Sequence, residues 1–364
     1  MNNIPKGYKQ TEVGVIPEDW EVDKIKNLAH ITTGSKNTQD RIDSGEYPFF
    51  VRSQTVERIN SYSFDGEAVL TAGDGVGTGK VFHYIKGKFD FHQRVYKVSD
   101  FKDKLDGYYF YLYFSNNFYN RIMQMTAKSS VDSVRMEMIA DMQIPLPHTK
   151  AEQTAIAKAL NDANALITQL KKLIAKKRNI KQGAMQELLK PKEGWDVKTI
   201  EELFDVTVGG DFKKEYSSEI KEEKHKYPIY SNSLVDEGLY GYCSYYTSDA
   251  NCITVTARGT IGFANYRDHK FTAIGRVIVL RPKVEVDCFY VSEYINNKIN
   301  FVLEVTGVPQ LTAPQISKYS ISLPKTKEDQ SKIAEILSDM DAEIEALEKK
   351  LEKYKMIKQG MMQN

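Results

Sequence analysis

Apolar residues recur with a seven-residue period along two stretches of the chain, residues 148–190 and 324–364. Within each period they alternate at spacings of four and three, the pattern of a helix that buries one narrow stripe against another helix. We therefore expect two long helices that pair through a coiled-coil seam. The alternative is two amphipathic helices that each pack on their own domain. The predicted seam consists of Ile156, Leu160, Ala163, Ile167, Leu170 and Ile174 in the first stretch, and of Ile333, Leu337, Met340, Ile344, Leu347 and Leu351 in the second.

The second stretch is a copy of the first. Residues 149–186 and 326–363 align without a gap, and 18 of these 38 positions are identical. A weaker similarity joins the segments that precede the two stretches. Its matches are Trp20 with Trp195, Gly34 with Gly209, Tyr47-Pro48 with Tyr227-Pro228, Lys88-Phe89 with Lys270-Phe271, and Arg94-Val95 with Arg276-Val277. The chain is therefore an internal repeat of two similar units.

Short runs of apolar and polar residues in alternation fill the segments before the helices. Residues 68–71, 94–98 and 276–280 are strand-like, and Gly, Asp and Asn punctuate such runs. Each segment also holds one aromatic helix candidate, residues 108–122 and 289–303. The predicted fold class is α+β, with two similar mixed α/β domains separated by two long antiparallel coiled-coil helices in a pseudo-twofold repeat. The predicted domains are residues 1–147 and 191–323, and the predicted helices are residues 148–190 and 324–364.

Charge predicts the direction in which the two helices pair. The first stretch carries nine Lys or Arg and three Asp or Glu, whereas its copy is nearly neutral. Parallel pairing would place the basic cluster Lys176, Lys177, Arg178 and Lys181 beside Lys353, Lys355 and Lys358. Antiparallel pairing places the same cluster beside Glu335, Asp339 and Asp341. Because like charges repel, we expect the antiparallel arrangement.

Composition narrows the class of protein. A chain of 364 residues is too long for one ordinary domain. No apolar run approaches the roughly 20 residues that cross a bilayer, and the first residues lack the apolar core of a secretion signal. Three cysteines without CxxC spacing fit a structural role in a reducing cytoplasm and make a metal site improbable; they are Cys243, Cys252 and Cys288.

No catalytic apparatus is recognisable, so we expect no catalytic residues. There is no Pro-Pro-Tyr/Phe adenine-methylation motif, and the six histidines show no ligand spacing. The stretch Gly73–Lys80 is P-loop-like, but it has one residue too many between its outer glycines, and Val81 stands where Ser or Thr should follow the lysine. A tight glycine turn is the better interpretation.

At this point the sequence resembles the DNA-specificity (S) subunit of type I restriction-modification systems. The resemblance covers essentially the whole chain and rests on the doubled domain–helix order. It rests also on the openings Ile16-Pro-Glu-Asp-Trp-Glu-Val and Gly194-Trp-Asp-Val, and on the exits Ile144-Pro-Leu-Pro and Ile321-Ser-Leu-Pro with the residues up to Gln153 and Gln330. No single motif is decisive, but their order and doubling are specific.

The resemblance implies a division of labour among subunits. Each globular part would be a target-recognition domain for one half of a split double-stranded DNA site. The helices would act as a spacer and as docking surface for two methyltransferase (M) subunits, which restriction (R) subunits join. Adenine methylation and DNA cleavage would be carried out by those partners, and S-adenosylmethionine, ATP and Mg are expected there, with no cofactor in this chain.

Residues that could contact DNA gather in turn-rich segments at partly equivalent places in both repeats. Base readout needs Arg, Lys, Asn or Gln side chains that reach a groove, and phosphate contacts need basic and small polar groups. The candidates are Lys36, Asn37, Arg52, Gln54, Lys80, Lys128 and Arg135 in the first domain, and Lys213, Lys214, Asn232, Arg258 and Gln310 in the second. For each of them the alternative is a solvated loop residue. The strongest are Arg52, Lys80, Asn232 and Arg258, which follow a doubled motif.

The two domains differ most at these loops, which predicts an asymmetric target. The glycine turn is longer in the first domain, and residues 211–226 form a charged insertion in the second. A non-DNA scaffold that presents two domains on a coiled-coil rod is the competing interpretation, because the net charge is only +1. A heptad seam can pair within one chain or with a second copy, so a homodimer of the isolated chain is a further alternative.

Overall fold

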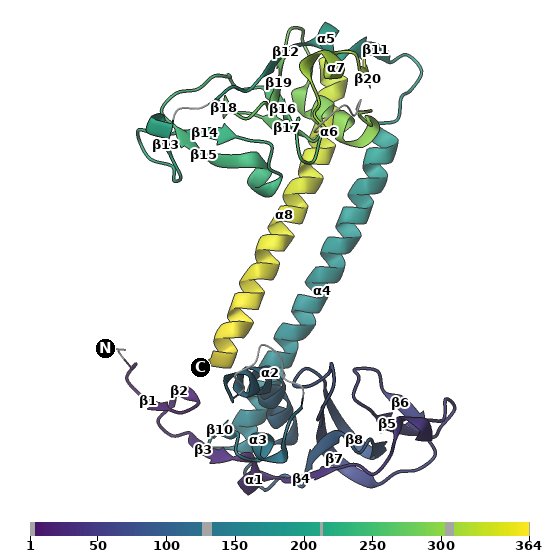
Figure 1. The fold of residues 1–364 in the computed structure, drawn as a ribbon, viewed down its shortest axis with the longest axis vertical. Coiled ribbons are helices and arrows are strands. Elements are labelled where there is room, and N and C mark those ends of the chain that lie inside the picture. The colour runs from purple at the N-terminus through teal and green to yellow at the C-terminus, as the bar shows by residue number, and fades with distance from the viewer. Residues whose placement is uncertain (1–3, 126–132, 212–213, 303–308, 364) are drawn as a thin grey trace. The chain divides into compact units, whose positions relative to one another are not determined.

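The computed structural model describes residues 4–125, 133–211, 214–302 and 309–363 (Figure 1). The chain divides into two compact units. Unit 1 comprises residues 1–170 and 350–364, and unit 2 comprises residues 171–349. Each unit therefore contains one globular domain together with a part of both long helices. Within the described residues, no helix is long and apolar enough to span a bilayer.

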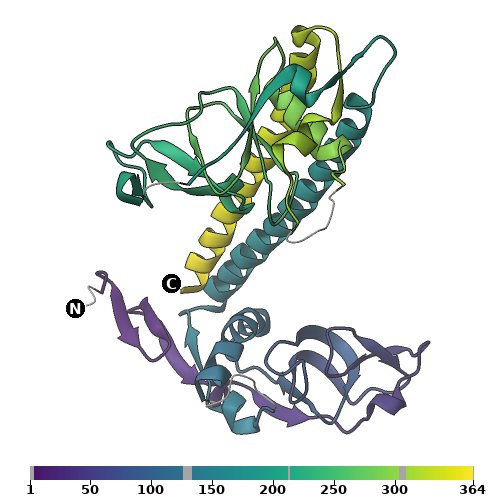
Figure 2. The same cartoon turned by 45° about the horizontal axis from the view of Figure 1, so that its top comes forward.

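The first globular domain is built on a six-stranded sheet with the order β4-β9-β7-β8-β5-β6. Strands β5 and β8 are parallel, and the other neighbours in the sheet are antiparallel. Two ribbons lie outside this sheet, β1 with β2 and β3 with β10. The strands are β1 (Tyr8–Thr11), β2 (Gly14–Pro17), β3 (Glu21–Lys24), β4 (His30–Thr33), β5 (Tyr47–Phe50), β6 (Glu57–Ile59), β7 (Phe64–Ala72), β8 (Phe82–Phe91), β9 (Val95–Ser99) and β10 (Gln143–Leu146). Figure 2 shows the β1–β2 ribbon near the N-terminus, apart from the main sheet.

An aromatic helix covers this sheet because its rings repeat on one face. Helix α2 (Gly107–Met125) buries Phe110, Phe114, Phe118 and Ile122 completely, and their spacing of four residues places them on one side. These rings pack with Val69 and Phe82 of the sheet in one hydrophobic core. The predicted aromatic helix is therefore a core element, and two short helices complete the domain, α1 (Ile25–Leu28) and α3 (Met136–Ala140).

The second globular domain repeats the elements of the first, with the sheet divided in two. One sheet has the order β12-β19-β16-β17 and the other β13-β15-β14-β18. Its strands are β11 (Asp196–Thr199), β12 (Phe204–Val208), β13 (Ser217–Ser218), β14 (Tyr227–Tyr230), β15 (Leu239–Cys243), β16 (Cys252–Val255), β17 (Ala264–Arg267), β18 (Thr272–Ala273), β19 (Ile278–Pro282) and β20 (Ser320–Leu323). Its helices are α5 (Ile200–Leu203), α6 (Cys288–Lys298) and α7 (Ala313–Ser317). Where the first domain has the long strand β8, the second has the two shorter strands β17 and β18.

Helix α6 is shorter than the sequence predicts, and the predicted end at residue 303 is wrong. Asp287 starts the helix, since its side chain accepts a hydrogen bond from the backbone N–H of Tyr290. The helix ends at Lys298 because Ile299 is extended. Phe301 then packs against Tyr319, with ring centroids 4.8 Å apart. Tertiary packing of this aromatic side chain outweighs the helical pattern.

The two long helices are α4 (Lys150–Leu188) and α8 (Lys327–Gln363). Each begins at a threonine whose hydroxyl caps the first turn. Thr149 accepts a hydrogen bond from the backbone N–H of Glu152 at 3.1 Å, and Thr326 accepts one from Asp329 at 3.2 Å. The doubled Thr-Lys motif thus sets both starts.

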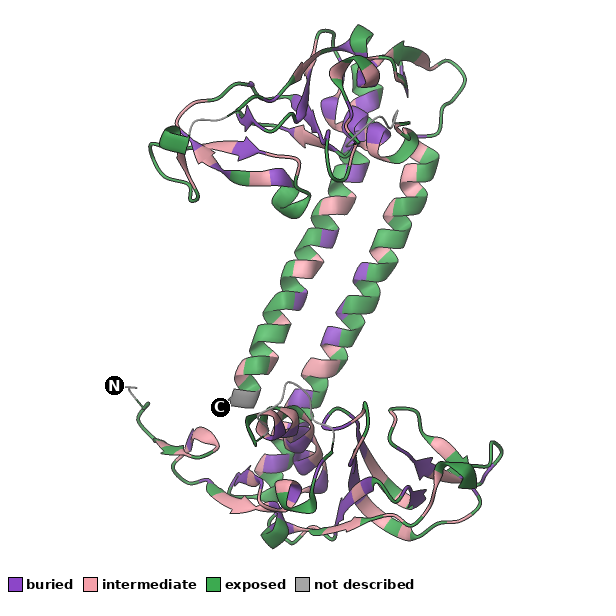
Figure 3. Cartoon of the chain, in the orientation of Figure 1, coloured by how far each residue is buried: buried purple, intermediate pink, exposed green. Residues whose placement is uncertain are grey.

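Every predicted seam residue is buried or half-buried (Figure 3). The first two in each helix belong to the core of the preceding domain, Ile156 and Leu160 in unit 1, and Ile333 and Leu337 in unit 2. The first turns of each long helix therefore pack as part of the globular domain that precedes it. Farther along unit 2, Ile174 and Ile344 are buried within the helical stretches.

Ion pairs within unit 2 show that α4 and α8 are antiparallel. The Nζ atom of Lys177 lies 2.7 Å from Glu343, and Nζ of Lys181 lies 2.6 Å from Asp341. Arg178 donates to Glu348. The predicted direction is confirmed, and Asp341 is a predicted partner. Glu343 and Glu348 take the places expected for Glu335 and Asp339.

Candidate nucleic-acid interface

An ionic cluster links two of the predicted loops in the first domain. Arg52, which follows β5, donates from Nη1 to the Oδ1 atom of Asp74 at 2.8 Å. Arg94, before β9, lies 3.7 Å from the other oxygen of the same carboxylate. The side chains of Arg52 and Arg94 remain 44% and 65% exposed, so both guanidinium groups keep free donors.

The loop with Lys36 and Asn37 meets the same segment. The backbone N–H of Gln93 donates to the carbonyl of Lys36 at 2.8 Å, and the Gln93 side chain donates to Oδ1 of Asn37. Because Arg94 directly follows Gln93 in the chain, Gln93 connects the loop of Lys36 and Asn37 to the ionic cluster. The structure thus links the predicted residues Lys36, Asn37 and Arg52 through residues 92–94.

The glycine turn packs beside Arg52. The residues after β7 form consecutive turns in which Gly75 and Gly79 have φ angles of 78° and 66°, conformations that favour glycine. A Cβ atom added at Gly77 would lie 2.6 Å from the backbone oxygen of Arg52, so that approach also requires glycine. Val76 at the tip is 99% exposed. This is the tight turn that the sequence predicts.

Three other predicted residues in the described part of the first domain take no part in the ion pairs of this cluster. Lys80 is exposed, and its Nζ atom is 5.2 Å from the ring centroid of Tyr119 on α2. Gln54 is exposed, and Arg135 is the N-cap residue of α3. Lys128 lies outside the described residues, as does Lys213 of the second domain.

The equivalent loops of the second domain use different chemistry. Arg258 donates from Nη2 to Oε1 of Gln310 at 2.8 Å and from Nε to the same atom at 3.1 Å, so two predicted residues form one unit. Asn232 accepts from the backbone N–H of Ala257 at 2.7 Å and donates to the carbonyl of Gly275 at 2.6 Å. Asn232 therefore fixes the loop that carries Arg258. Lys214 is exposed in a separate short helical turn.

Backbone contacts show which loop residues are equivalent. Gly73 accepts a hydrogen bond from the backbone N–H of Val134, and Ala257 accepts one from Leu311. Asp74 and Arg258, which follow Gly73 and Ala257, therefore occupy equivalent places with opposite charges. The two scaffolds present different hydrogen-bonding groups at the same position.

His92 adds a titratable group to the first cluster. Burial lowers the pKa of His92, and the neighbouring Arg52 lowers it further. Its Nδ1 atom accepts a hydrogen bond from the backbone N–H of Arg94 at 2.9 Å. Because a protonated Nδ1 cannot accept, the neutral ring holds Arg94 in place.

Sequence reasoning missed four members of this site, Asp74, His92, Gln93 and Arg94. Arg94 carried a signal, since it belongs to the doubled Arg-Val motif. Asp74 sits inside the glycine turn, where a carboxylate suggests a turn residue more than an ion-pair partner. Also missed was Arg267, which is buried, stacks 3.5 Å from the ring centroid of Tyr230 and pairs with Glu237 at 3.2 Å.

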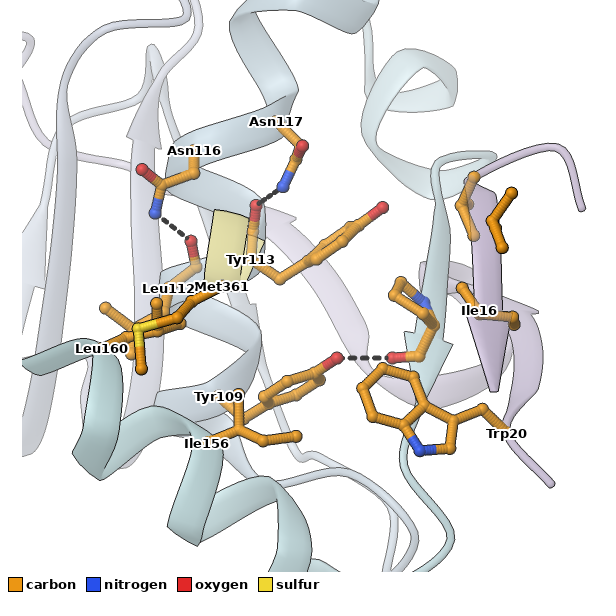
Figure 4. Close-up of a pocket in the computed structure, with 13 residues that line it drawn as sticks. Ile16, Trp20, Tyr109, Leu112, Tyr113, Asn116, Asn117, Ile156, Leu160 and Met361 are labelled. Atoms are coloured by element: carbon orange, nitrogen blue, oxygen red, sulfur yellow. Dashed lines mark hydrogen bonds between the residues drawn. The ribbon is translucent and has the colours of Figure 1, made fainter. Parts of the chain in front are cut away.

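A separate apolar pocket lies in unit 1, away from these polar loops. Figure 4 shows Trp20, Tyr109 and Tyr113 around it, with Leu160 of α4 and Met361 of α8. The hydroxyl of Tyr109 donates to the carbonyl of Pro145 at 2.9 Å. In the described part of the chain, no group of three His, Cys, Asp or Glu residues could hold a metal ion.

Comparison with known proteins identifies the repeat. The family model described as type I restriction modification DNA specificity domain matches the chain twice, over residues 17–181 and 192–355. A type I specificity subunit of Mycoplasma pneumoniae is 28% identical over 84% of this chain and 85% of its own length. The MjaX type I restriction enzyme specificity subunit of Methanocaldococcus jannaschii is 26% identical over 98% of this chain and 95% of its own.

Solved structures agree on the fold. The crystal structure of a type I restriction-modification S subunit from M. genitalium aligns with a TM-score of 0.67 over 94% of this chain and 95% of that one, at 17% identity. A second structure, which concerns assembly and conformational transition of the type I restriction-modification system, aligns with a TM-score of 0.53 over 95% and 97%, at 12% identity. The two matches to the family model together cover most of this chain. The chain therefore belongs to the type I restriction-modification DNA specificity family.

Proposed function

We propose that this chain is the specificity subunit of a type I restriction-modification complex and that each globular domain reads one half of a bipartite, asymmetric DNA target. The observation that carries the proposal is the pair of equivalent scaffolds with unlike loops. Asp74 holds Arg52 in the first domain, whereas at the equivalent place Arg258 is held by Gln310. Because base readout depends on which donors and acceptors face the groove, these two loop sets select different half-sites.

The residues at the loop ends divide between base and phosphate contacts. The guanidinium groups of Arg52 and Arg258 have the fork of donors that matches the acceptors of guanine, and both remain accessible. Lys36, Lys80 and Lys214 are point charges suited to phosphates. Lys128 and Lys213 are proposed on sequence grounds for the same role.

The long helices set the spacing between half-sites and dock the partners. Residues 148–190 keep their basic excess on exposed positions of α4, among them Lys158, Lys171 and Lys172, which are available to acidic surfaces of two methyltransferase subunits. Restriction subunits join the complex that this chain forms with the methyltransferase subunits. The chain itself is non-catalytic and acts in the cytoplasm, and S-adenosylmethionine, ATP and Mg bind to the partners.

Detection of methylated bases across the genome tests this proposal. The host is compared with and without this gene, while its methyltransferase partner is kept. We expect a split, asymmetric motif with a fixed spacer that disappears on deletion. A methylation pattern that deletion leaves unchanged, in a host where the partner is active, would refute the proposal and favour a scaffold that does not bind DNA.

A further inference from the structure

The same cluster of two tyrosines and one lysine occurs in both globular domains. In the first domain, the ring centroids of Tyr47 and Tyr62 are 5.1 Å apart and the rings are inclined by 59°. Lys88 places Nζ 4.6 Å from the Tyr62 centroid. In the second domain, Tyr227 and Tyr246 are also 5.1 Å apart, at 55°, and Lys270 lies 4.1 Å from the Tyr246 centroid. The two Tyr–Tyr–Lys clusters thus share one geometry.

The clusters also occupy the same place in the fold. The first tyrosine opens β5 or β14, the strand that makes the parallel pair in each domain. The second lies in the loop after that strand's antiparallel neighbour, β6 or β15. The lysine, Lys88 or Lys270, lies just before the residues of β8 or β18 that pair in parallel with β5 or β14. Loop lengths differ between the domains, so the common geometry is not a by-product of identical connections.

Both clusters are accessible. Tyr62 and Tyr246 are 47% and 41% exposed, and the side chain of Lys270 is 46% exposed. Lys88 is exposed as well. In the second domain, Tyr227 and Lys270 of the cluster line a concave surface that also includes Lys221, Lys226 and Tyr230. Asp249, 3.5 Å from Lys270, offsets part of this positive charge.

A feature shared by two domains with unlike reading loops is suited to a part of the target that does not vary. In duplex DNA that part is the phosphate backbone, and Lys ammonium and Tyr hydroxyl groups are donors found at phosphates. The hydroxyl of Tyr246 already accepts a hydrogen bond from Lys270 at 2.9 Å, which leaves its own proton free to donate outward.

The distance to the reading loops fits one half-site. Arg52 stands five positions after Tyr47, and Asn232 five positions after Tyr227, which corresponds to at most about 17 Å of extended strand. One turn of DNA is roughly 34 Å. A phosphate contact at the cluster can therefore coexist with base contacts at the loops.

We propose that the two Tyr–Tyr–Lys clusters are phosphate-contact sites that hold duplex DNA irrespective of its sequence. The inference rests on the proposed function, because it assumes that the domains bind DNA. It adds a separation of tasks in which the clusters supply affinity and the loops after β5 and β14 supply specificity.

The test uses the full complex with its partner subunits and the double variant Lys88→Gln, Lys270→Gln. Affinity for a target duplex and for an unrelated duplex is measured over a range of salt concentrations by fluorescence anisotropy. Loss of two phosphate contacts should reduce the slope of log K against log salt by about 1.8, at roughly 0.9 per contact. Both duplexes should lose affinity by the same factor, and the methylated motif should stay unchanged.

Matched variants separate this role from a structural one. Lys102→Gln with Lys198→Gln removes the same charge at exposed positions outside the clusters and the loops, and should leave the slope unaltered. Lys88→Arg with Lys270→Arg keeps the charge and should retain the wild-type slope. Tyr62→Phe with Tyr246→Phe keeps the rings and should weaken binding to both duplexes.

Two results would overturn the inference while the proposed function stands. One is an unchanged affinity and slope in the Lys-to-Gln variant, with the wild-type complex binding its target. The other is a changed methylation motif, which would make the clusters part of sequence readout. Failure of the wild-type complex to bind DNA would instead refute the proposed function itself.

Discussion

Gln153 and Gln330 make the same hydrogen bonds at the starts of the two long helices. The Oε1 atom of Gln153 accepts from the backbone N–H of Asp106 at 2.8 Å, and that of Gln330 accepts from Asp287 at 2.9 Å. Each Nε2 donates to a proline carbonyl, Pro147 at 3.2 Å or Pro324 at 2.9 Å. Both side chains are almost fully buried. Each amide thus joins a long helix to the segment before the domain's aromatic helix.

Removal of either amide should destabilise its own domain. Gln153→Ala leaves a buried backbone N–H and carbonyl groups without partners, which costs about 1–3 kcal/mol. Gln330→Ala should do the same in unit 2. Urea unfolding measures both, and Gln169→Ala at an exposed position of α4 is the control, with an expected effect within about 0.5 kcal/mol. Equal stabilities of Gln153→Ala and the wild type would show that the anchor contributes nothing.

Lys181 joins three elements of unit 2, and its charge should be needed there. Its Nζ atom lies 2.6 Å from Asp341 on α8 and 3.9 Å from Glu293 on α6. Burial raises the pKa of Glu293, and Lys181 counteracts that rise. Lys181→Met should therefore destabilise unit 2 by about 1–3 kcal/mol.

A double-mutant cycle with Asp341→Asn isolates the pair. We expect a coupling energy of at least about 0.5 kcal/mol, as for residues in direct contact. The exposed pair Lys349 and Glu345 offers a matched comparison, with about 0.3–0.5 kcal/mol expected for an i,i+4 pair on a helix. A coupling between Lys181 and Asp341 no larger than this would contradict the role given to Lys181.

The long helices were predictable because their pattern is local and doubled. The heptads and the Thr-Lys starts place α4 and α8 within a few residues of the observed bounds. The opposed charges of Lys181 and Asp341 also gave the direction of pairing. The end of α6 was not predictable, since it depends on Phe301 packing against Tyr319, a contact made through tertiary structure.

Arg258 should govern one position of the second half-site. Its guanidinium is oriented by Gln310, as a side chain that reads a base requires. Arg258→Ala should relax the methylation motif at one base pair, equivalent to about 1–3 kcal/mol of lost discrimination. The first half of the motif is an internal control and should not change. Loss of methylation at all sites equally would assign Arg258 to phosphate contact.

The polar site was less predictable than the helices. Sequence reasoning named Lys36, Asn37 and Arg52 as candidates in separate turns, and the structure links these turns through residues 92–94. It did not find Asp74, because an ion pair across 22 positions depends on how the strands cross. The sequence matched the two glycine stretches, but backbone hydrogen bonds were needed to show that Asp74 and Arg258 are equivalent, because the turns differ in length.

Acid should destabilise the first domain through His92. Its pKa is lowered in the folded state, so the neutral ring is favoured there. Stability from this group is therefore complete above the unfolded pKa of about 6.5 and is lost as pH falls below it through the folded pKa. His83, whose pKa burial also lowers, acts in the same direction.

Substitution separates the two histidines. His92→Asn keeps an acceptor for the backbone N–H of Arg94 but cannot titrate in this range. We expect the free energy of unfolding to fall less steeply between pH 7 and pH 5 in His92→Asn than in the wild type, as measured by urea titration. Identical slopes in the two proteins would show that His92 does not contribute to the loss of stability in acid.

Exchange of one domain tests the central claim most directly. Residues 191–323 are replaced by the equivalent segment of a relative with a different target, in a host that supplies the methyltransferase partner, and methylated bases are mapped across the genome. Independent reading by two domains predicts that only one half of the motif changes, while the other half and the spacer length stay fixed. A change in both halves, in neither half, or in the spacer would contradict it.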